Sequence, residues 1–384
     1  MLKTAFWISF LFITYTYAGY PFILFLLARF FQMKVHRATP DDPPSVSIII
    51  AAKNEETNIR KRLENLLAQD YPSGKMEIIV ISDGSSDSTG TIVNEYVGTW
   101  PPGDPENSTI LLITHTENRG KPAALNAGLE IATGDVIVFT DARQEFESNA
   151  ISELIANFGD PGVGAVSGEL MFRKDGDTAI RAEMGLYWNY EKWIRKTESR
   201  IHSVAGATGG IYAARRSLVE ALPEPVILDD VMVPMRAVLK GYRTVFESRA
   251  IAWDTVSKDL AQEKKRKVRT LLGNYQLIQL MPELLTPGKN PIFFQFVSHK
   301  FMRLLVPFFL IMMSLSAAMT GEGPYIIFFL ATVAFAVFPL FEKRLSSVPL
   351  AGKIASVSRA FFSLNYFALL AFLRFIRPGK EDIW

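Results

Sequence analysis

The chain of 384 residues contains no cysteine, so disulfide bonds, thiolate nucleophiles and cysteine-ligated metals are excluded. This absence also fits a reducing compartment. The four histidines are too scattered along the sequence to indicate a zinc site: His36, His115, His202 and His299. A Gly-rich run at residues 206–210 lacks both the Lys-Ser/Thr ending of a Walker loop and GxGxxG spacing. Two common nucleotide-binding fingerprints are therefore missing from this run.

An excess of charge of one sign is also missing. The 41 basic and 39 acidic residues leave a formal net charge of only +2, which indicates no nucleic-acid partner. Hydrophobic residues make up 49% of the chain and include 28 phenylalanines, which is high for a soluble enzyme. Because the apolar excess is concentrated at the two ends, the composition indicates a polar central domain between membrane segments.

The N-terminal end carries an apolar segment, Ala5–Leu27, whose roughly 23 residues are enough to span a bilayer. A cleaved signal peptide is the alternative, because residues 17–19 resemble a cleavage site. The apolar run resumes after them, however, and is followed by Arg29, Lys34 and Arg37. A retained anchor is therefore favoured, and the basic residues after it place the following domain in the cytoplasm.

Two further apolar spans, Phe301–Met319 and Tyr325–Phe341, lie near the C-terminus. The loop after them contains Lys343 and Arg344 and is expected to be cytoplasmic. A last segment, Arg359–Ile376, is interrupted by polar residues, and its pattern is compatible with a tilted, re-entrant or interfacial helix. The expected organisation is an N-terminal anchor (1–38), a cytoplasmic domain (39–257), basic amphipathic helices (258–299) and a C-terminal region of two to three spans (300–384).

The polar domain opens with a strand–helix–strand pattern. Two apolar runs, Val46–Ala52 and Ile78–Ile81, flank a segment with one apolar helical face. Roughly forty residues are the length of one right-handed βαβ crossover. Neither run alternates apolar and polar residues, so both faces of each strand are expected to be covered. The pattern predicts a mostly parallel, Rossmann-like α/β sheet, whose ligands bind at the carboxyl ends of the strands.

Acidic residues recur at or just beyond these strand ends, at Glu55, Asp83, Asp141 and the pair Asp229/Asp230. A carboxylate in such a place can accept a ribose hydroxyl, hold a cation or act as a general base. The simpler interpretation is that each one caps the next helix. Recurrence after successive strands, with Lys121 at a helix start between them, favours a site.

The chain carries, in order, AAKNEE, VISDGSSDST, NRGKPAALNAGLEIATGD, VFTDA, GATGGIYAARRSL and LDDVMVPMRAVLKGYRTVF. Over Ser45–Arg269 this combination resembles the inverting family 2 glycosyltransferases, which have a GT-A fold. With its apolar ends, the chain looks like the membrane-integrated branch that makes hyaluronan, cellulose, chitin or poly-N-acetylglucosamine. The resemblance implies sugar transfer from a nucleotide donor, most simply a UDP-sugar, to a hydroxyl.

The resemblance also implies roles for single residues. Ala51, Glu55 and Asp83 would hold the nucleoside, and Lys121 would lie near the base or the diphosphate. Asp141 matches the first Asp of the family's DxD element, where the sugar meets a metal ion, Mg²⁺ or Mn²⁺.

On the acceptor side, Asp230 matches the catalytic base, and like-charge repulsion from Asp229 would raise its pKa. Trp188 is the candidate aromatic contact to the acceptor. Gly209 and Gly210 would let the backbone approach the acceptor closely.

The sequence departs from the family at the DxD element, where Arg143 replaces the second Asp. One interpretation is that Arg143 neutralises the diphosphate and makes metal weaker or dispensable. A second is that Asp141, with Asp254 or Glu145, still binds the cation through oxygen ligands. A surface ion pair of Arg143 is the third.

The second departure is at the family's QxxRW element, which corresponds here to residues 266–270. Arg269 is kept and is expected to contact the pyrophosphate, but Gln and Trp are missing. Trp253 or Tyr275 are the candidate replacements for the missing sugar platform. The departure weakens the expectation of processive synthesis.

The sequence thus predicts a plasma-membrane glycosyltransferase with a cytoplasmic catalytic domain and a growing polysaccharide as acceptor. Transfer of one sugar to a lipid-linked acceptor is the first alternative, and a catalytically silent partner of a synthase complex is the second. The bilayer is an expected partner, and export partners or a second copy are compatible with so few spans.

Overall fold

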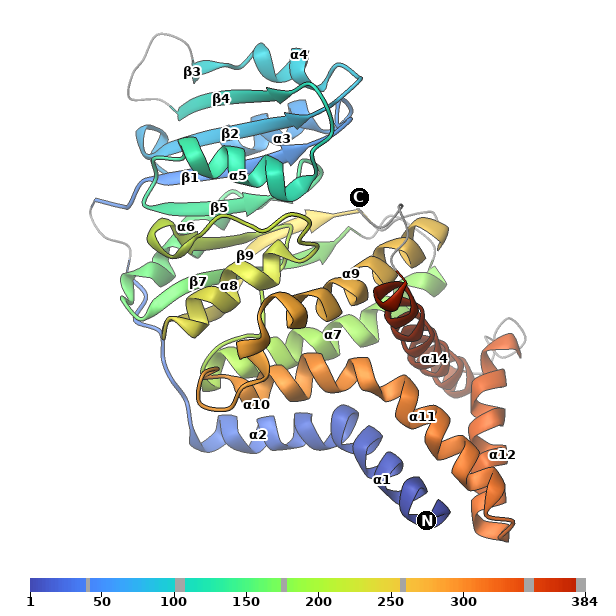
Figure 1. Cartoon of the computed structure of the whole chain (residues 1–384). Helices are drawn as coiled ribbons and strands as arrows, with labels where there is room; N and C mark the ends of the chain where they lie inside the picture. The colour runs from blue at the N-terminus through green and yellow to red at the C-terminus, as the bar shows by residue number, and fades with distance from the viewer. Residues whose placement is uncertain (39–41, 101–107, 174–177, 256–259, 342–348, 378–384) are drawn as a thin grey trace.

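The computed structural model describes residues 1–38, 42–100, 108–173, 178–255, 260–341 and 349–377 (Figure 1). An α/β domain lies above a group of long helices, and α1 (Leu2–Thr14), α2 (Tyr20–Phe30), α11 (Met302–Met319), α12 (Gly323–Val337) and α14 (Pro349–Ile376) belong to that group. Lys343 and Arg344, on which the expected orientation of one loop partly depends, lie outside the described residues.

One nine-stranded sheet forms the α/β domain, with the strand order β3-β4-β2-β1-β5-β8-β7-β9-β6. The strands are β1 Val46–Ala52, β2 Met76–Asp83, β3 Gly98–Trp100, β4 Ser108–His115, β5 Val136–Thr140, β6 Glu145–Phe146, β7 Val163–Phe172, β8 Tyr212–Arg215 and β9 Arg243–Asp254.

The four neighbouring strands β4, β2, β1 and β5 are parallel, which confirms the predicted α/β sheet. Successive residues of β1 point into different cores, because Ile48 and Ile50 pack with helix α3 (Ile59–Leu67) and Ile49 packs with α5 (Lys121–Ile131). Both faces are therefore covered, as the unbroken apolar runs indicate. This arrangement brings the carboxyl ends of β1, β2 and β5 to one edge.

The other half of the sheet departs from the sequence prediction. Strand β9 is one strand of 12 residues. From the sequence alone, Thr244–Glu247 and Ala250–Trp253 are predicted as two separate short strands, because Ser248 and Arg249 lie between them. Strand β9 runs parallel to β7 with register shifts between Val163/Ala165 and Ser167/Glu169. The irregular pairing lets one strand continue through Ser248 and Arg249, although these two polar residues interrupt the apolar pattern in the sequence. Strands β3 and β6 were not predicted.

Besides α3 and α5, the α-helices of the α/β domain are α4 Thr89–Asn94, α6 Ala150–Ile155 and α8 Asp229–Leu239. Those of the membrane-type group and its junction are α1 Leu2–Thr14, α2 Tyr20–Phe30, α7 Thr178–Ile201, α9 Leu260–Leu280, α10 Phe293–Phe296, α11 Met302–Met319, α12 Gly323–Val337 and α14 Pro349–Ile376. Short 3₁₀ turns lie at Ser73–Lys75, Ala156–Gly159, Arg216–Leu218, Pro282–Leu285 and Phe338–Phe341, and π-helical turns at Tyr15–Gly19 and Val297–Phe301.

Among the described residues, four helical segments are long and apolar enough to cross a membrane by length and composition. They are Leu2–Phe30, Phe293–Met319, Gly323–Leu340 and Ile354–Ile376. The last of these is part of one continuous helix, α14, so the polar residues noted in the sequence do not break it. Three of the candidates lie in the C-terminal region, and how many of them cross a membrane stays a prediction.

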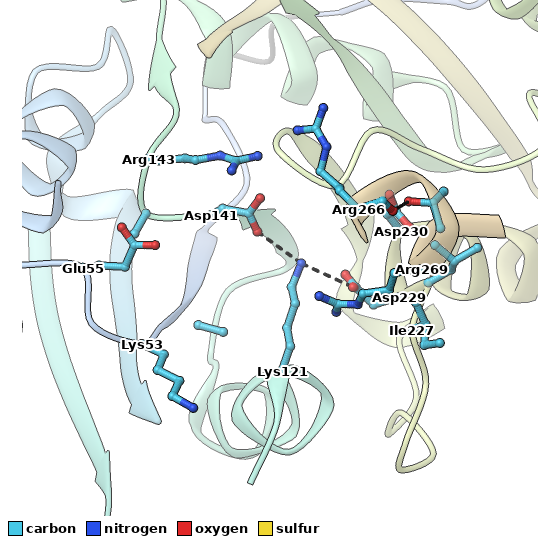
Figure 2. A pocket seen from close by; sticks show the side chains of 15 residues that line it. Lys53, Glu55, Lys121, Asp141, Arg143, Ile227, Asp229, Asp230, Arg266 and Arg269 are labelled. Atoms are coloured by element: carbon cyan, nitrogen blue, oxygen red, sulfur yellow. Dashed lines mark hydrogen bonds and ion pairs between the residues drawn. The ribbon is translucent and has the colours of Figure 1, made fainter. Parts of the chain in front are cut away.

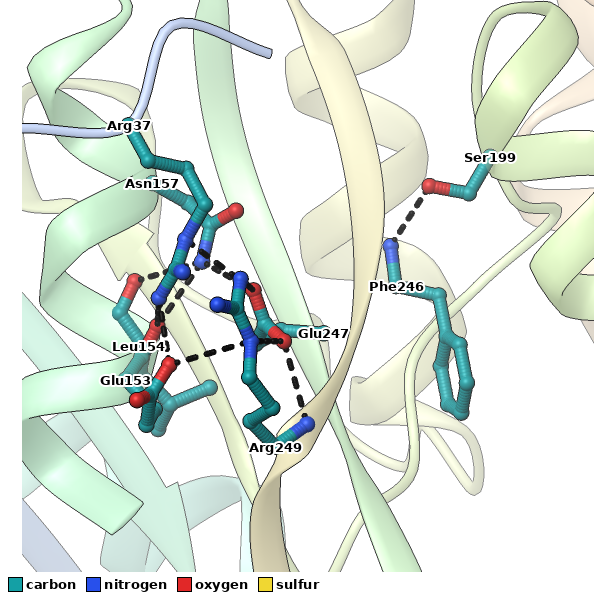
Figure 3. A network of polar contacts seen from close by, with 8 residues as sticks. All are labelled: Arg37, Glu153, Leu154, Asn157, Ser199, Phe246, Glu247 and Arg249. Atoms are coloured by element: carbon teal, nitrogen blue, oxygen red, sulfur yellow. Dashed lines mark hydrogen bonds and ion pairs between the residues drawn. The ribbon is translucent and has the colours of Figure 1, made fainter. Parts of the chain in front are cut away.

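The segment after α2 is tied to the α/β domain by a polar network (Figure 3). Arg37 forms ion pairs with Glu153 of α6 and with Glu247 of β9, the latter at 3.2 Å. Arg249 also pairs with Glu247, at 2.9 Å, and Asn157 Nδ2 donates to the same side chain at 3.2 Å. These contacts fix where the chain leaves α2 and enters the sheet.

Candidate active site

The structure contains a cavity of about 340 Å³ at the carboxyl edge of the parallel strands (Figure 2). Nine of the residues singled out in the sequence line it: Ala51, Glu55, Lys121, Asp141, Arg143, Gly209, Asp229, Asp230 and Arg269. Ala51 lies near the end of β1, Asp141 follows β5, and Lys121 opens α5. The fold therefore brings these residues, which are up to about 200 positions apart in sequence, to one edge of the sheet. This is the edge at which ligands of open α/β sheets bind, at the carboxyl ends of the strands.

Lys121 lies at the centre of the charges in this cavity. Its Nζ is 3.2 Å from Asp141 Oδ1 and 3.3 Å from Asp229 Oδ1. Burial alone lowers the pKa of Lys121, but the carboxylates of Asp141, Asp229 and Asp230 raise it overall, so the ammonium stays charged. Burial likewise favours the neutral acid at Asp141, yet Lys121 and Arg143 hold the pKa of this carboxyl below its usual value.

Asp229 and Asp230 begin helix α8, where the helix dipole favours negative charge. Tyr212 Oη donates a 2.9 Å hydrogen bond to Asp229 Oδ2, while Lys121 holds the other oxygen. Among the described residues, the Asp230 carboxylate has no such pair of side-chain partners. Burial, and then the neighbouring charge of Asp229, raise the pKa of Asp230 to about 6. The raised pKa expected of this carboxyl is therefore found, with burial as the larger cause.

Gly209 lies directly against Asp230. A Cβ atom on Gly209 would be 3.0 Å from Asp230 Oδ2, so a side chain there would crowd the carboxylate. Gly210 does not line the cavity, and a Cβ on it would instead meet Gln144 at 3.2 Å. The glycine run thus keeps one side of Asp230 open at Gly209, whereas Gly210 gives room for packing.

Arg143 faces the cavity but is paired. Its guanidinium is 3.2 Å from Asp254 Oδ2, an oxygen that also accepts a 3.1 Å hydrogen bond from Gln144 Nε2. Glu145 is instead paired with Arg173, at 2.5 Å. Asp254 and Glu145 are therefore engaged by cationic or amide groups, and the described residues include no cluster of three or more His, Cys, Asp or Glu that could hold a metal ion.

Asp141 remains suitable as a single protein ligand to a cation. Lys121 contacts only its Oδ1, and the side chain is 36% exposed to the cavity. Mg²⁺ and similar ions are commonly held by one or two carboxylates together with substrate phosphates. The residues thus fit a metal carried in with a diphosphate.

Helix α9 closes the cavity with Arg266, Arg269 and Thr270. The described lining includes no aromatic side chain. Trp253 Nε1 donates to Glu147 at 2.5 Å, and Tyr275 Oη donates to the Leu304 carbonyl at 3.0 Å, and neither ring lines the cavity. The two replacements suggested for the missing sugar platform are thus committed to other contacts.

Asp83 and Trp188 do not line the cavity. Asp83 is fully buried and accepts hydrogen bonds from Gly120 N at 2.8 Å and Arg119 N at 3.0 Å. These bonds fix the turn that begins α5 and so position Lys121, and contact with the nucleoside stays a prediction. Trp188 lies on α7 against Phe172, with ring centroids 5.4 Å apart, and its acceptor role likewise stays a prediction.

Two basic residues that the sequence argument did not single out also line the cavity, Lys53 and Arg266. Lys53 belongs to the polar turn after β1, and its position two residues before Glu55 was a usable signal. Arg266 stands three residues before Arg269, so the two share one face of α9.

The fold and the cavity define an α/β domain with a cavity at the sheet edge that is lined by both acidic and basic side chains. Residues 136–341 match the family model described as glycosyl transferase family group 2, and residues 47–222 match glycosyl transferase family 2. Because the first match covers more than half of the chain, the chain belongs to glycosyltransferase family 2.

Similar proteins include the poly-beta-1,6-N-acetyl-D-glucosamine synthase of Staphylococcus aureus (strain COL), 28% identical over 242 residues, which are 62% of this chain and 56% of that one. The probable glycosyltransferase YdaM of Bacillus subtilis (strain 168) is 29% identical over 259 residues, 65% of this chain and 60% of its own. The chain thus matches less than two thirds of each relative.

Among solved structures, the mannosyltransferase PcManGT from Pyrobaculum calidifontis, in complex with GDP-Man and Mn²⁺, has a TM-score of 0.74. It is 22% identical in sequence, with 99% of this chain and 100% of that one covered. This likeness confirms the predicted fold class over nearly the whole chain.

Proposed function

We propose that this chain is a membrane-integrated, inverting hexosyltransferase that moves a sugar from a UDP-sugar to a hydroxyl of a growing polysaccharide. The observation that carries the proposal is the Lys121 ammonium between Asp141 and Asp229, beside a carboxylate, Asp230, whose pKa is raised to about 6. In this arrangement the charges of Lys121 and Asp141 are fixed and available to a donor, whereas Asp230 can gain and lose a proton beside an acceptor.

On the donor side, the leaving nucleoside diphosphate gains negative charge as the bond to the anomeric carbon breaks. Lys53, Arg143, Arg266 and Arg269 line the cavity and supply cations for it. Ala51 and Glu55, on β1 and its turn, are proposed to hold the nucleoside. PcManGT, which was solved with GDP-Man, supports a nucleotide-sugar donor and makes GDP-sugars the necessary comparison.

On the acceptor side, Asp230 is proposed to take the proton from the attacking hydroxyl in a direct displacement that inverts the anomeric centre. A base with a pKa near 6 is ionised at neutral pH and still takes a proton more readily than an ordinary Asp. Gly209 leaves room for the hydroxyl beside Asp230 Oδ2. Asp229, held by Tyr212 and Lys121, is proposed to tune this pKa.

A divalent cation, Mg²⁺ or Mn²⁺, would be held by Asp141 together with the donor phosphates. When bound it would neutralise charge on the diphosphate. The Mn²⁺ in the PcManGT complex supports this assignment. Arg143 would share the task, because its guanidinium reaches the same cavity.

The membrane placement rests on the four apolar helical segments and on the basic residues that follow the first of them. We propose that the α/β domain is on the cytoplasmic side of the plasma membrane. The polysaccharide acceptor is supported by the name of the staphylococcal relative, a polymer synthase. So few spans also make an export partner or a second copy plausible.

The test is nucleotide release by the purified chain in nanodiscs, over a panel of UDP- and GDP-sugars, with Mg²⁺, Mn²⁺ or EDTA. Release with one donor, lost in Asp230→Asn, would support the proposal and identify the sugar. Full release in EDTA would show that transfer does not require a metal ion, and Arg143 would then be the group that neutralises the diphosphate. Saturable nucleotide binding without release, with lipid and glycan acceptors supplied, would instead favour the silent partner.

A second candidate is transfer of a single sugar to a lipid-linked acceptor. It is favoured by the absence of an aromatic side chain from the described cavity lining, because a polymer that slides through a site normally stacks on such rings. Product analysis separates the two, since a polymerase gives a ladder of lengths and this alternative gives one lipid product.

A further inference from the structure

A second groove, of about 510 Å³, lies beside the contact between α2 and α7 and shares no lining residue with the active-site cavity. The two helices pack against each other through Tyr20, Leu24 and Ile194. The groove lies at the end of α2 that leads into the α/β domain, because Arg29 is in the last turn of that helix.

Two arginines, Arg29 from α2 and Arg200 from α7, line this groove, and none of its lining residues is acidic. Both side chains are exposed. Neither guanidinium forms an ion pair or hydrogen bond within the described part of the chain. Two cations from different helices that converge without a carboxylate create a local site for an anion, and guanidinium groups match phosphate geometry especially well.

Besides the two arginines, the groove is lined by Gln32 and Thr197 and by apolar and aromatic side chains. Phe25, Phe30 and Trp193 are 53%, 73% and 40% exposed. Phe25 and Phe30 belong to the first candidate membrane segment, Leu2–Phe30, and exposed aromatic rings near basic residues are typical of the membrane–water interface. A free anion would gain nothing from these rings, whereas acyl chains would cover them.

We propose that this groove binds an anionic phospholipid, with the phosphate between Arg29 and Arg200 and the acyl chains along Phe25 and Phe30. The inference rests on the proposed membrane placement, but not on sugar transfer. Its ligand would join α2 to α7 beside the contacts that already connect them, which include the packing of Leu24 with Ile194 and the hydrogen bond from Tyr20 Oη to Glu198.

The experiment uses the full chain in nanodiscs that contain phosphatidylglycerol and phosphatidylcholine in equal amounts. The protein is released from the nanodiscs in the mass spectrometer, and native mass spectrometry identifies the lipids that stay bound to it. Arg29→Gln/Arg200→Gln is expected to reduce the preference for phosphatidylglycerol by about 30-fold, as estimated for two basic residues at a lipid phosphate. The matched control is Arg374→Gln/Arg377→Gln at the end of α14, which removes the same charge and is expected to keep the preference. Arg29→Lys/Arg200→Lys keeps the positive charge, so this variant is expected to retain most of the preference for phosphatidylglycerol.

Equal loss in the α14 control would overturn the proposal, because a general surface charge would then explain the preference. No loss in Arg29→Gln/Arg200→Gln, or no preference in the wild-type chain, would also overturn it. Displacement of the lipid by inorganic phosphate would overturn it as well, because the site would then bind a free anion without acyl chains. Nucleotide release measured on the same samples is a separate readout, so a chain with a lipid preference and no transfer would refute only the proposed function.

Discussion

At the scale of single residues, Asp230 carries the sharpest prediction. Asp230→Asn keeps the size of the side chain but removes the base, and we expect nucleotide release to fall by about 10²–10⁴-fold. In the wild-type chain kcat/KM should rise with pH and level off above about 6, where burial and Asp229 place the pKa. The measurement is release over pH 5–8, with Glu220→Gln, an exposed carboxylate paired with Lys240, as the control. A pH profile without this rise would assign the base elsewhere.

The same raised pKa predicts an effect on stability with a defined sign. The folded protein holds the proton on Asp230 up to about pH 6, whereas an unfolded Asp releases it near 3.9. The stabilising contribution is therefore present below about pH 4 and lost as the pH rises through 6. We expect Asp230→Asn to raise the melting temperature at pH 8, by an amount equivalent to about 1–2 kcal/mol, and to leave it unchanged at pH 4.

Glu220 is the control for that experiment, because its pKa is shifted in the opposite direction from that of Asp230. Its pKa is lowered by the hydrogen bond with Lys240, so Glu220→Gln should give no gain in melting temperature at pH 8. A gain in both variants would mean that net charge, rather than the burial of Asp230, sets the stability.

Gly209 is the third residue-scale case. A methyl group added there would lie 3.0 Å from Asp230 Oδ2 and would push the carboxylate aside or block the acceptor. We expect Gly209→Ala to reduce kcat by at least about tenfold while nucleotide binding changes little, since displaced catalytic groups cost rate steeply. Gly323→Ala is the matched control, because a Cβ there meets nothing within 4 Å. An equal loss in the control would show a folding defect.

At the scale of elements, a buried polar network connects α7 to the membrane-type helices. His299 Nδ1 is 2.8 Å from Glu198 Oε1, and His299 Nε2 is 3.0 Å from Glu191 Oε2. Tyr20 Oη donates to the same Glu198 oxygen at 2.5 Å, and Arg303 pairs with Glu191. These contacts join α2, α7 and α11 at one point, although their residues are up to about 280 positions apart in sequence.

Breaking this network should destabilise the whole junction. Glu198→Ala would leave His299 and Tyr20 buried without their shared partner, and we expect a loss of about 3 kcal/mol, measured by thermal unfolding in detergent. Glu322→Ala removes an exposed ion pair with Lys3 instead and should leave the melting temperature nearly unchanged. Similar losses in both variants would contradict a structural role for the network.

The elements that the sequence predicted are those with local signals. Strands β1, β2 and β5 each contain a run of four or more apolar residues, and the start of α5 follows a glycine and includes a proline. Strand β9 was divided wrongly, because its polar residues Ser248 and Arg249 read as a loop when pairing with β7 is unknown. The same limit applies to His299, whose partners on α7 lie about 100 positions away.

The residues that line the cavity could also be predicted from the sequence in part. The strand-end rule and the family resemblance placed nine residues that do line one cavity. Neither reveals what a side chain already contacts. Asp83 accepts a hydrogen bond from the turn before α5 and Trp253 donates to Glu147, and neither lines the cavity, so their proposed ligand contacts stay predictions. Burial and existing hydrogen bonds decide such cases, and both follow from the three-dimensional packing.

At the scale of the whole molecule, the absence of cysteine allows the proposed orientation to be tested directly, because any single introduced thiol is unique. Thr320, at the turn between α11 and α12, should lie outside the cytoplasm if Phe293–Met319 and Gly323–Leu340 both cross the membrane. Glu130, exposed on α5, should lie inside it. We expect a membrane-impermeant maleimide to label Thr320→Cys in intact cells, and to label Glu130→Cys only after permeabilisation. The reverse pattern would place the catalytic domain outside, where nucleotide sugars are scarce, and labelling of both in intact cells would show that these helices do not cross.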